Sequence, residues 1–141
     1  MRVLVTGASG MLGRATATAL LERGDDVTVL QRRPAGLPCR EVLGDVADPA
    51  AVGRAVEGQD AVLHLAAKVD VTGPWAEYLT ANVDGTRTVV GACRSAGVEV
   101  AAVLTAAALP VDIRHQSKVD RGEVARRAAR VLAGGRAPRR R

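Results

Sequence analysis

The chain has 141 residues, 48% of them hydrophobic, which is enough for one buried core and leaves no room for a second full domain. Its two cysteines, Cys39 and Cys93, lie far apart without histidines at metal-ligand spacing, so the sequence predicts neither a disulfide nor a metal site. No apolar run reaches the length of a membrane span and no leader segment precedes the first strand pattern, which predicts a soluble, cytoplasmic protein.

The net charge of +5 is uneven along the chain. Residues 1–99 carry ten Lys and Arg against twelve Asp and Glu, a net charge of −2, whereas residues 100–141 carry ten against three, a net charge of +7. A basic tail is typical of nucleic-acid-binding arms, but this one has no aromatic residues for base stacking, which makes nucleic acid an unlikely partner.

Strands and helices are predicted to alternate from the first residues. Residues 3–5 predict a buried strand, residues 11–23 a helix that ends at Gly24, and residues 27–30 a second strand. This order is a βαβ unit with a right-handed crossover.

The alternation continues beyond the first unit. Residues 41–43 predict a third strand, and Asp48 before Pro49 predicts the capped start of a helix that runs to Gly58. Residues 61–66 predict a fourth strand.

A longer helical segment spans about residues 75–96 and ends at Gly97, and residues 98–104 predict a fifth strand. The pattern therefore predicts an α/β fold with a doubly wound parallel sheet in a domain of residues 1–104.

Three glycines spaced three apart lie where the first strand becomes the first helix, in VTGASGMLG. Gly7 allows a tight turn, Gly10 lets the backbone approach a pyrophosphate, and Gly13 lets the helix pack against the sheet. A glycine-rich turn without a ligand is the alternative, but the position within a βαβ unit favours dinucleotide binding at the start of the helix. The residues predicted to lie along the phosphates are Gly7, Ser9, Gly10, Met11, Leu12 and Gly13.

VTGASGMLG, GDVAD, HLAA and NVDGT occur in an order and spacing that resemble the extended short-chain dehydrogenase/reductase family, the NAD-dependent epimerases, dehydratases and 3β-hydroxysteroid dehydrogenase-like proteins. The resemblance covers residues 1 to about 99, and AAKVDVTGPW is most similar to the hydroxysteroid dehydrogenase-like branch. It implies a Rossmann-like NAD(P)-binding domain.

The resemblance implies roles for further residues. Asp45 and Val46 would hold the adenine, with an ordinary turn aspartate as the alternative for Asp45. Leu65, Ala66 and Ala67 would let the ribose and nicotinamide side of the cofactor lie against backbone, while His64 before them is interpreted as a structural strand-end residue.

Lys68 could reach a phosphate or ribose, although an exposed loop lysine is equally ordinary. Asn82 matches the family's helix asparagine that steadies the active-site backbone, and Gly85 and Thr86 would let that helix pack closely on the sheet.

The end of the second strand predicts the choice of cofactor. NAD-binding proteins of this architecture place an acidic residue there for the ribose hydroxyls, whereas Gln31, Arg32 and Arg33 stand here. An amide followed by two cations favours NADP over NAD, unless both arginines lie in a solvated loop.

The family's reactive residues are a Ser or Thr after the fifth strand and a Tyr four residues before a Lys. Ala106 falls at the position of the Ser and Thr105 is one residue early. The single tyrosine, Tyr78, precedes Asn82 rather than a lysine. Arg114 holds the tyrosine position relative to Lys118, so the sequence predicts no catalytic residue.

Residues 105–141 are predicted to be a non-family Ala/Arg-rich basic tail with a possible helix over residues 120–133 and a disordered end. The whole chain has eighteen arginines against two lysines, which suggests a GC-rich coding sequence. A shifted reading frame in such DNA gives the mixture of Ala, Arg, Gly and Pro that makes up most of the tail. A natural short form is the competing interpretation.

The sequence thus predicts the NAD(P)-binding domain of an oxidoreductase or epimerase, truncated and catalytically incomplete, with an unknown substrate. A non-catalytic nucleotide-binding module or a non-functional frameshifted remnant is the alternative. A truncated sheet would expose an edge strand, which predicts self-association.

Overall fold

The computed structural model describes residues 1–69, 72–98, 111–112 and 118–119. The chain divides into two compact units, Met1–Val100 and Ala101–Arg141. All of the predicted dinucleotide-binding residues belong to the first unit.

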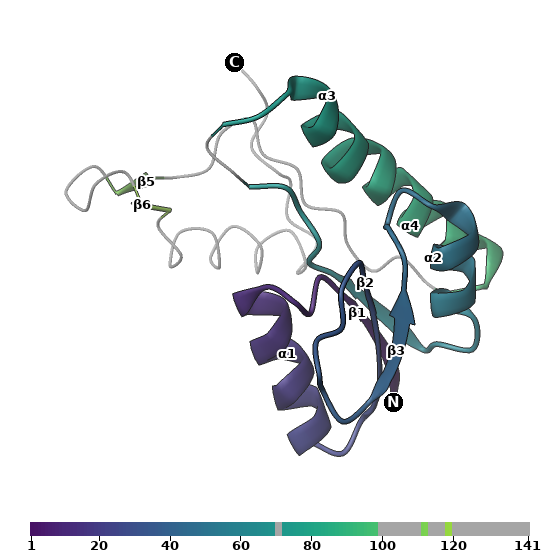
Figure 1. The fold of residues 1–141 in the computed structure, drawn as a ribbon. Coiled ribbons are helices and arrows are strands. Elements are labelled where there is room, and N and C mark those ends of the chain that lie inside the picture. Colours follow the sequence, from purple (N-terminus) through teal and green to yellow (C-terminus); the bar gives the residue numbers. More distant parts are fainter. Residues whose placement is uncertain (70–71, 99–110, 113–117, 120–141) are drawn as a thin grey trace, which may run out of the picture. The chain divides into compact units, whose positions relative to one another are not determined.

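The first unit is built on a four-stranded parallel sheet in the order β3-β2-β1-β4 (Figure 1). Each strand is rich in Val and Leu, which suit a pleated surface buried on both sides. The strands are β1 (Arg2–Thr6), β2 (Asp26–Gln31), β3 (Arg40–Leu43) and β4 (Ala61–His64).

Helix α1 (Met11–Glu22) connects β1 to β2, and Gly24 follows it with φ +87°, the left-handed conformation that favours glycine. Helix α2 (Pro49–Val56) begins as predicted, because the Asp48 carboxylate accepts the Ala50 N–H at 2.9 Å.

The predicted long helix is one continuous helical segment in three parts: α3 (Trp75–Tyr78), a π-helical turn η1 (Leu79–Asp84) and α4 (Gly85–Ser95). The π turn is a difference from the expected regular helix. The backbone carbonyl of Asn82, within this turn, accepts a hydrogen bond from the Thr86 hydroxyl at 2.8 Å. The side chain thus supplies a donor to a carbonyl in the turn where the regular α-helical backbone bonding is interrupted. Asn82 therefore lies at the irregular turn rather than in a regular helix.

Two apolar clusters cover the two faces of the sheet, which confirms the doubly wound arrangement. One contains Leu4 and Leu30 with residues of α2 and α4, and the other contains Val3 and Val5 with residues of α1. Figure 1 shows α1 on one side of the strands and α2 with α4 on the other. The Rossmann-like fold predicted for this part of the chain is present.

The fourth strand is shorter than predicted. It ends at His64 rather than at Ala66, because the N–H groups of Leu65 and Ala66 donate to the Thr6 hydroxyl rather than to a strand carbonyl. The second unit contains a short antiparallel pair that the sequence did not predict, β5 (Val111–Asp112) and β6 (Lys118–Val119). The rest of the predicted fifth strand after Val98, Thr105, Ala106, Arg114 and the predicted helix 120–133 lie outside the described residues.

Removing the cap of α2 tests the helix assignment. Asp48→Ala is expected to lower the free energy of unfolding by about 1 kcal/mol, because the Ala50 N–H loses its acceptor. Asp48→Asn keeps a capping oxygen and is the matched control. Equal urea denaturation midpoints for Asp48→Ala and the parent chain would contradict the capping role.

Candidate functional site

The carboxyl ends of the four parallel strands meet at one edge of the sheet, and most of the predicted binding residues lie on the turns after them. Met11, Leu12 and Gly13 lie in the first turn of α1, and Asn82 lies in η1. The Gly7 N–H donates to the Leu30 carbonyl at 3.1 Å, and the Gly44 N–H donates to the Gln31 carbonyl at 3.0 Å. These bonds fix the turns after β1 and β3 to the end of β2. Ligands of open parallel sheets bind at this edge.

Two of the three motif glycines are required by the fold itself. Gly7 has φ +76°, and a Cβ there would lie 2.8 Å from the Ala66 Cα. A Cβ on Gly13 would lie 2.2 Å from the Gly7 carbonyl oxygen. The nearest contacts of Gly13 are therefore with the glycine turn that directly follows β1.

Gly10 differs from its two neighbours in the motif. Its φ of −85° suits any residue, and among the described residues a Cβ there would have a single neighbour, the Gly7 oxygen at 3.4 Å. Gly10 is the N-cap of α1 and supplies no side-chain hydrogen bond to the first turn. Ser9, Met11 and Leu12 are exposed around it, Met11 by 88%.

The first turn of α1 contains no acidic residue, and its N-cap makes no side-chain hydrogen bond. We call this an open helix N-terminus. Orphan N–H groups and the positive end of the helix dipole at such a terminus attract an anion. The absence of a side chain at Gly10 leaves space for an anion to approach the backbone.

A buried amide lies at the end of β2. Gln31 is 4% exposed, and neither its Nε2 nor its Oε1 has a hydrogen-bond partner among the described residues. An unpaired buried amide costs free energy, so a partner from outside the chain would be favourable here. Its strand position is the one that meets the adenosine ribose in folds of this type.

Arg32 and Arg33 follow Gln31 and are both exposed. The loop after them is held from two directions: the Arg14 guanidinium donates to the Ala35 carbonyl, and the Glu41 carboxylate accepts the Ala35 N–H at 3.0 Å. The two cations therefore extend from an anchored loop at the same edge of the sheet as the glycine turn.

Asp45 and Val46 follow β3. The Asp45 carboxylate accepts the Ala47 N–H at 2.9 Å, which is the local bond expected of a turn aspartate. Val46 is buried, and a Cβ on Gly85 would lie 2.7 Å from its Cγ2. Gly85 therefore permits close packing of α4 on Val46 in the turn after β3, whereas the sequence predicted packing on the sheet.

Residues 65–68 are held by side chains from two other elements. The Thr6 hydroxyl accepts the N–H groups of Leu65 and Ala66 at 3.0 and 3.1 Å. The Asn82 amide makes two bonds to Lys68, accepting its N–H at 2.8 Å and donating to its carbonyl at 2.9 Å. Ala67, between the two anchors, is exposed.

The Lys68 side chain lies against α3. Its ammonium is 3.1 Å from a Glu77 carboxylate oxygen and 5.3 Å from the centroid of the Tyr78 ring. The Tyr78 hydroxyl donates to the Thr72 carbonyl at 3.1 Å, and its ring stacks on Trp75. Both interpretations of Lys68 stay open, because a lysine that contacts a carboxylate can still exchange it for a phosphate.

Sequence reasoning missed the part played by Thr6 and Thr86. Their hydroxyls contact the two ring nitrogens of His64, Thr6 at Nδ1 (2.8 Å) and Thr86 at Nε2 (3.1 Å). Burial lowers the pKa of His64, which favours the neutral ring. The spacing of the motifs gave no sign of this contact, because the three residues come from distant segments.

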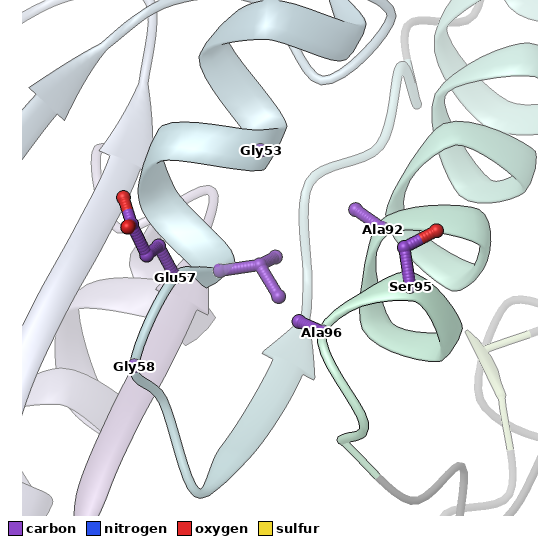
Figure 2. A pocket seen from close by; sticks show the side chains of 7 residues that line it. Gly53, Glu57, Gly58, Ala92, Ser95 and Ala96 are labelled. Atoms are coloured by element: carbon purple, nitrogen blue, oxygen red, sulfur yellow. The ribbon is translucent and has the colours of Figure 1, made fainter.

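A hollow of about 390 Å³ lies elsewhere, between the ends of α2 and α4. Figure 2 shows Gly53 and Glu57 on one side of it and Ala92, Ser95 and Ala96 on the other. None of the predicted binding residues lines it, so this hollow is separate from the edge of the sheet.

Among the described residues, no three His, Cys, Asp or Glu side chains come together as a metal site would require. A search of the same residues finds no helix with the length and apolar character needed to span a bilayer.

A parallel sheet with a glycine-rich turn between its first strand and the N-terminus of its first helix is the arrangement of the Rossmann-like class of dinucleotide-binding domains. The model of the NAD dependent epimerase/dehydratase family matches residues 3–128. The chain belongs to this family. The match extends beyond residue 99, where the resemblance of the motifs ends.

Relatives and solved structures agree with this assignment. The chain is 42% identical over 102 residues to a 2-alkyl-3-oxoalkanoate reductase of Stenotrophomonas maltophilia, covering 70% of this chain and 31% of the relative. It is 40% identical over 109 residues to a 3-beta-hydroxysteroid dehydrogenase of Mycolicibacterium neoaurum, covering 70% and 30%.

A short-chain dehydrogenase/reductase superfamily protein of Agrobacterium tumefaciens with bound NAD superposes with a TM-score of 0.66 at 38% identity, covering 70% of this chain and 30% of that one. The chain thus spans about a third of the length of the relatives that it matches.

Proposed function

We propose that this chain binds a nicotinamide dinucleotide along the carboxyl edge of its sheet. The observation that carries the proposal is the open N-terminus of α1, where Gly10 has space for a side chain but carries none. The unpaired amide of Gln31 supports the same ligand, because a ribose hydroxyl both donates and accepts hydrogen bonds.

The residues proposed to contact the ligand are those predicted from the sequence. The pyrophosphate lies at the N-terminus of α1, the adenine beside Asp45 and Val46, and the nicotinamide ribose along residues 65–68. The proposed set is Gly7, Ser9, Gly10, Met11, Leu12, Gly13, Arg32, Arg33, Asp45, Val46, Leu65, Ala66, Ala67, Lys68 and Asn82. Calorimetric titration with NAD(H) and NADP(H) tests binding directly, and no heat of binding with any of the four would contradict it.

NADP(H) is expected to bind about tenfold more tightly than NAD(H), because Arg32 and Arg33 can make charge-assisted hydrogen bonds to a 2′-phosphate. The double variant Arg32→Ala/Arg33→Ala should lose this preference and keep NAD(H) binding. Arg54→Ala removes an exposed arginine from α2 and is the matched control. Equal affinities for both cofactors, unchanged in the double variant, would overturn the preference.

We also propose that the chain as it stands is a binding module without a complete catalytic set, because its 141 residues lack a tyrosine four residues before a lysine. Its basic tail is proposed to derive from a frameshift, on the evidence of its Ala/Arg-rich composition. Sequencing the locus tests this origin, since family sequence in another downstream frame is expected only after a frameshift. A cytoplasmic location and self-association through a sheet edge remain predictions.

A further inference from the structure

The His64 side chain lies between the residues that hold the backbone of segment 65–68. Its Nδ1 lies 2.8 Å from the Thr6 hydroxyl at the end of β1, and its Nε2 lies 3.1 Å from the Thr86 hydroxyl in α4. HLAA and NVDGT are therefore in contact through this ring, although 22 residues separate His64 from Thr86. The directions of the hydrogen bonds around the ring can be worked out from its partners.

The proton on Nε2 follows from the bonds of Thr86. A hydroxyl has one proton to donate, and Thr86 donates it to the Asn82 carbonyl at 2.8 Å. Thr86 can therefore only accept at its contact with His64. The ring nitrogen that faces it, Nε2, must carry the proton.

The other ring nitrogen is constrained by Thr6. The Thr6 oxygen accepts the N–H groups of Leu65 and Ala66, which uses both of its lone pairs. Its one remaining capability is to donate, and Nδ1 of His64 is the partner at 2.8 Å. Nδ1 must therefore be unprotonated, so the ring is the neutral Nε2–H tautomer.

No other state of the ring satisfies these partners. The Nδ1–H tautomer and the doubly protonated ring both place a proton against Thr6, whose lone pairs are already used. The Thr6 hydroxyl would have to release the N–H of Leu65 or of Ala66. The fixed position of residues 65 and 66 thus depends on the protonation state of His64.

We propose that His64, as the neutral Nε2–H tautomer, is a positioning residue that sets the backbone of residues 65–68 for dinucleotide binding. This inference rests on the proposed function for its ligand and on the hydrogen-bond geometry for its mechanism. Asn82 completes the arrangement, because its carbonyl accepts from Thr86 while its amide holds Lys68.

Burial supports the neutral state, since it is the cause that lowers the pKa of His64. The side chains on the ring are uncharged hydroxyls. In the described part of the chain, the neighbouring elements and loops carry three ion pairs: Arg2 with Asp60, Lys68 with Glu77, and Arg87 with Asp84. The further charged side chain of α4 is Arg94, in its last turn.

Because the folded-state pKa lies below the unfolded value, the contribution of the ring is fully present above the unfolded pKa. It is lost as the pH falls through the folded pKa.

The tautomer is tested by ¹⁵N NMR of the ring nitrogens. The chain has two histidines, so His115→Gln leaves His64 as the single imidazole. We expect a protonated Nε2 and an unprotonated Nδ1, and we expect this state to persist to lower pH than in a solvent-exposed histidine. An Nδ1–H ring, or a rapidly exchanging mixture, would overturn the proposal whether or not a cofactor binds.

The positioning role is tested by amide hydrogen exchange at residues 65, 66 and 68 and by NADH titration. His64→Phe keeps a ring without either nitrogen and should speed exchange at these amides and weaken NADH binding about tenfold. His64→Gln retains one acceptor and one donor and cannot be protonated, so it should restore part of both readouts and remove their acid dependence.

Thr86→Val is the second variant if His64→Phe fails to fold, and it should also speed exchange at residues 65 and 66. Unchanged exchange in a folded variant would contradict the role of His64. If exchange is faster in the variants but the parent chain itself does not bind NADH, the proposed function is wrong and the role of His64 in positioning the backbone stands.

Discussion

Replacing Gly10 by valine is expected to abolish dinucleotide binding while the chain stays folded. The described part of the chain has room for the side chain, because Gly10 has an ordinary φ of −85° and its Cβ position has one neighbour there, at 3.4 Å. A branched side chain at the N-cap would fill the space in front of the orphan N–H groups of α1, where a pyrophosphate must approach. The loss of a favourable N-cap residue should cost only about 1 kcal/mol.

The other two motif glycines should behave in the opposite way. Gly13→Val places a Cβ 2.2 Å from the Gly7 oxygen, and we expect it to destabilise the fold by about 3 kcal/mol or more. Gly7→Val combines a φ of +76° with a clash at Ala66 and should be at least as severe. We therefore expect this glycine motif to contain two positions that the fold requires and one, Gly10, that matters for the ligand alone.

Thermal unfolding and calorimetric titration of the same samples separate these effects. Gly91→Val is the matched control, since no described group outside its own helix backbone lies within 4 Å of the Cβ position of Gly91 in α4. The control should fold and bind. A folded Gly10→Val chain that binds the cofactor like the parent would reduce the glycine motif to a turn.

Much of the fold could be predicted from the sequence because it depends on local signals. The apolar runs of β1 and β2, the Asp48 cap and the glycine after α1 each specify their element without help from distant residues. The end of β4 could not be predicted in this way. It is set by the Thr6 hydroxyl, which comes from a strand nearly sixty residues earlier in the chain.

The candidate site divides along the same line. The glycine turn and the pair of cations after β2 are each a short continuous stretch of sequence that directly follows a strand. Their placement at one edge therefore follows from the parallel order of the strands. The burial of Gln31 and the ring contacts of His64 depend on partners from several elements. A sequence pattern identifies such residues as polar and strand-terminal, but it does not reveal which atoms they face.

The second large effect is expected in turnover: the chain should hold a reduced dinucleotide without oxidising it. Reduction of a carbonyl needs a proton donor beside the substrate oxygen, and general acid catalysis of this kind is worth about 10²–10⁴ in rate. In the family that role belongs to the phenol of a tyrosine whose pKa is lowered by a lysine. Tyr78 is the only tyrosine of this chain, and Asn82 stands four residues after it.

The contacts of Tyr78 differ from those of the family's reactive tyrosine. Its hydroxyl donates to the Thr72 carbonyl at 3.1 Å, and its ring stacks on Trp75. The Lys68 ammonium lies 5.3 Å from the ring centroid and within 3.1 Å of a Glu77 oxygen, so a carboxylate already compensates part of its charge.

Oxidation of bound NADPH is measured directly by single-turnover absorbance with a panel of ketones and sugar nucleotides. We expect the absorbance of the reduced cofactor to persist. Tyr78→Phe and Gly10→Val are the two diagnostic variants. Oxidation by the parent chain that disappears in Tyr78→Phe would assign the proton donor to Tyr78 despite its hydrogen bond. Oxidation that disappears only in Gly10→Val would place the donor at another residue, and either result would show that the catalytic set is present in these 141 residues.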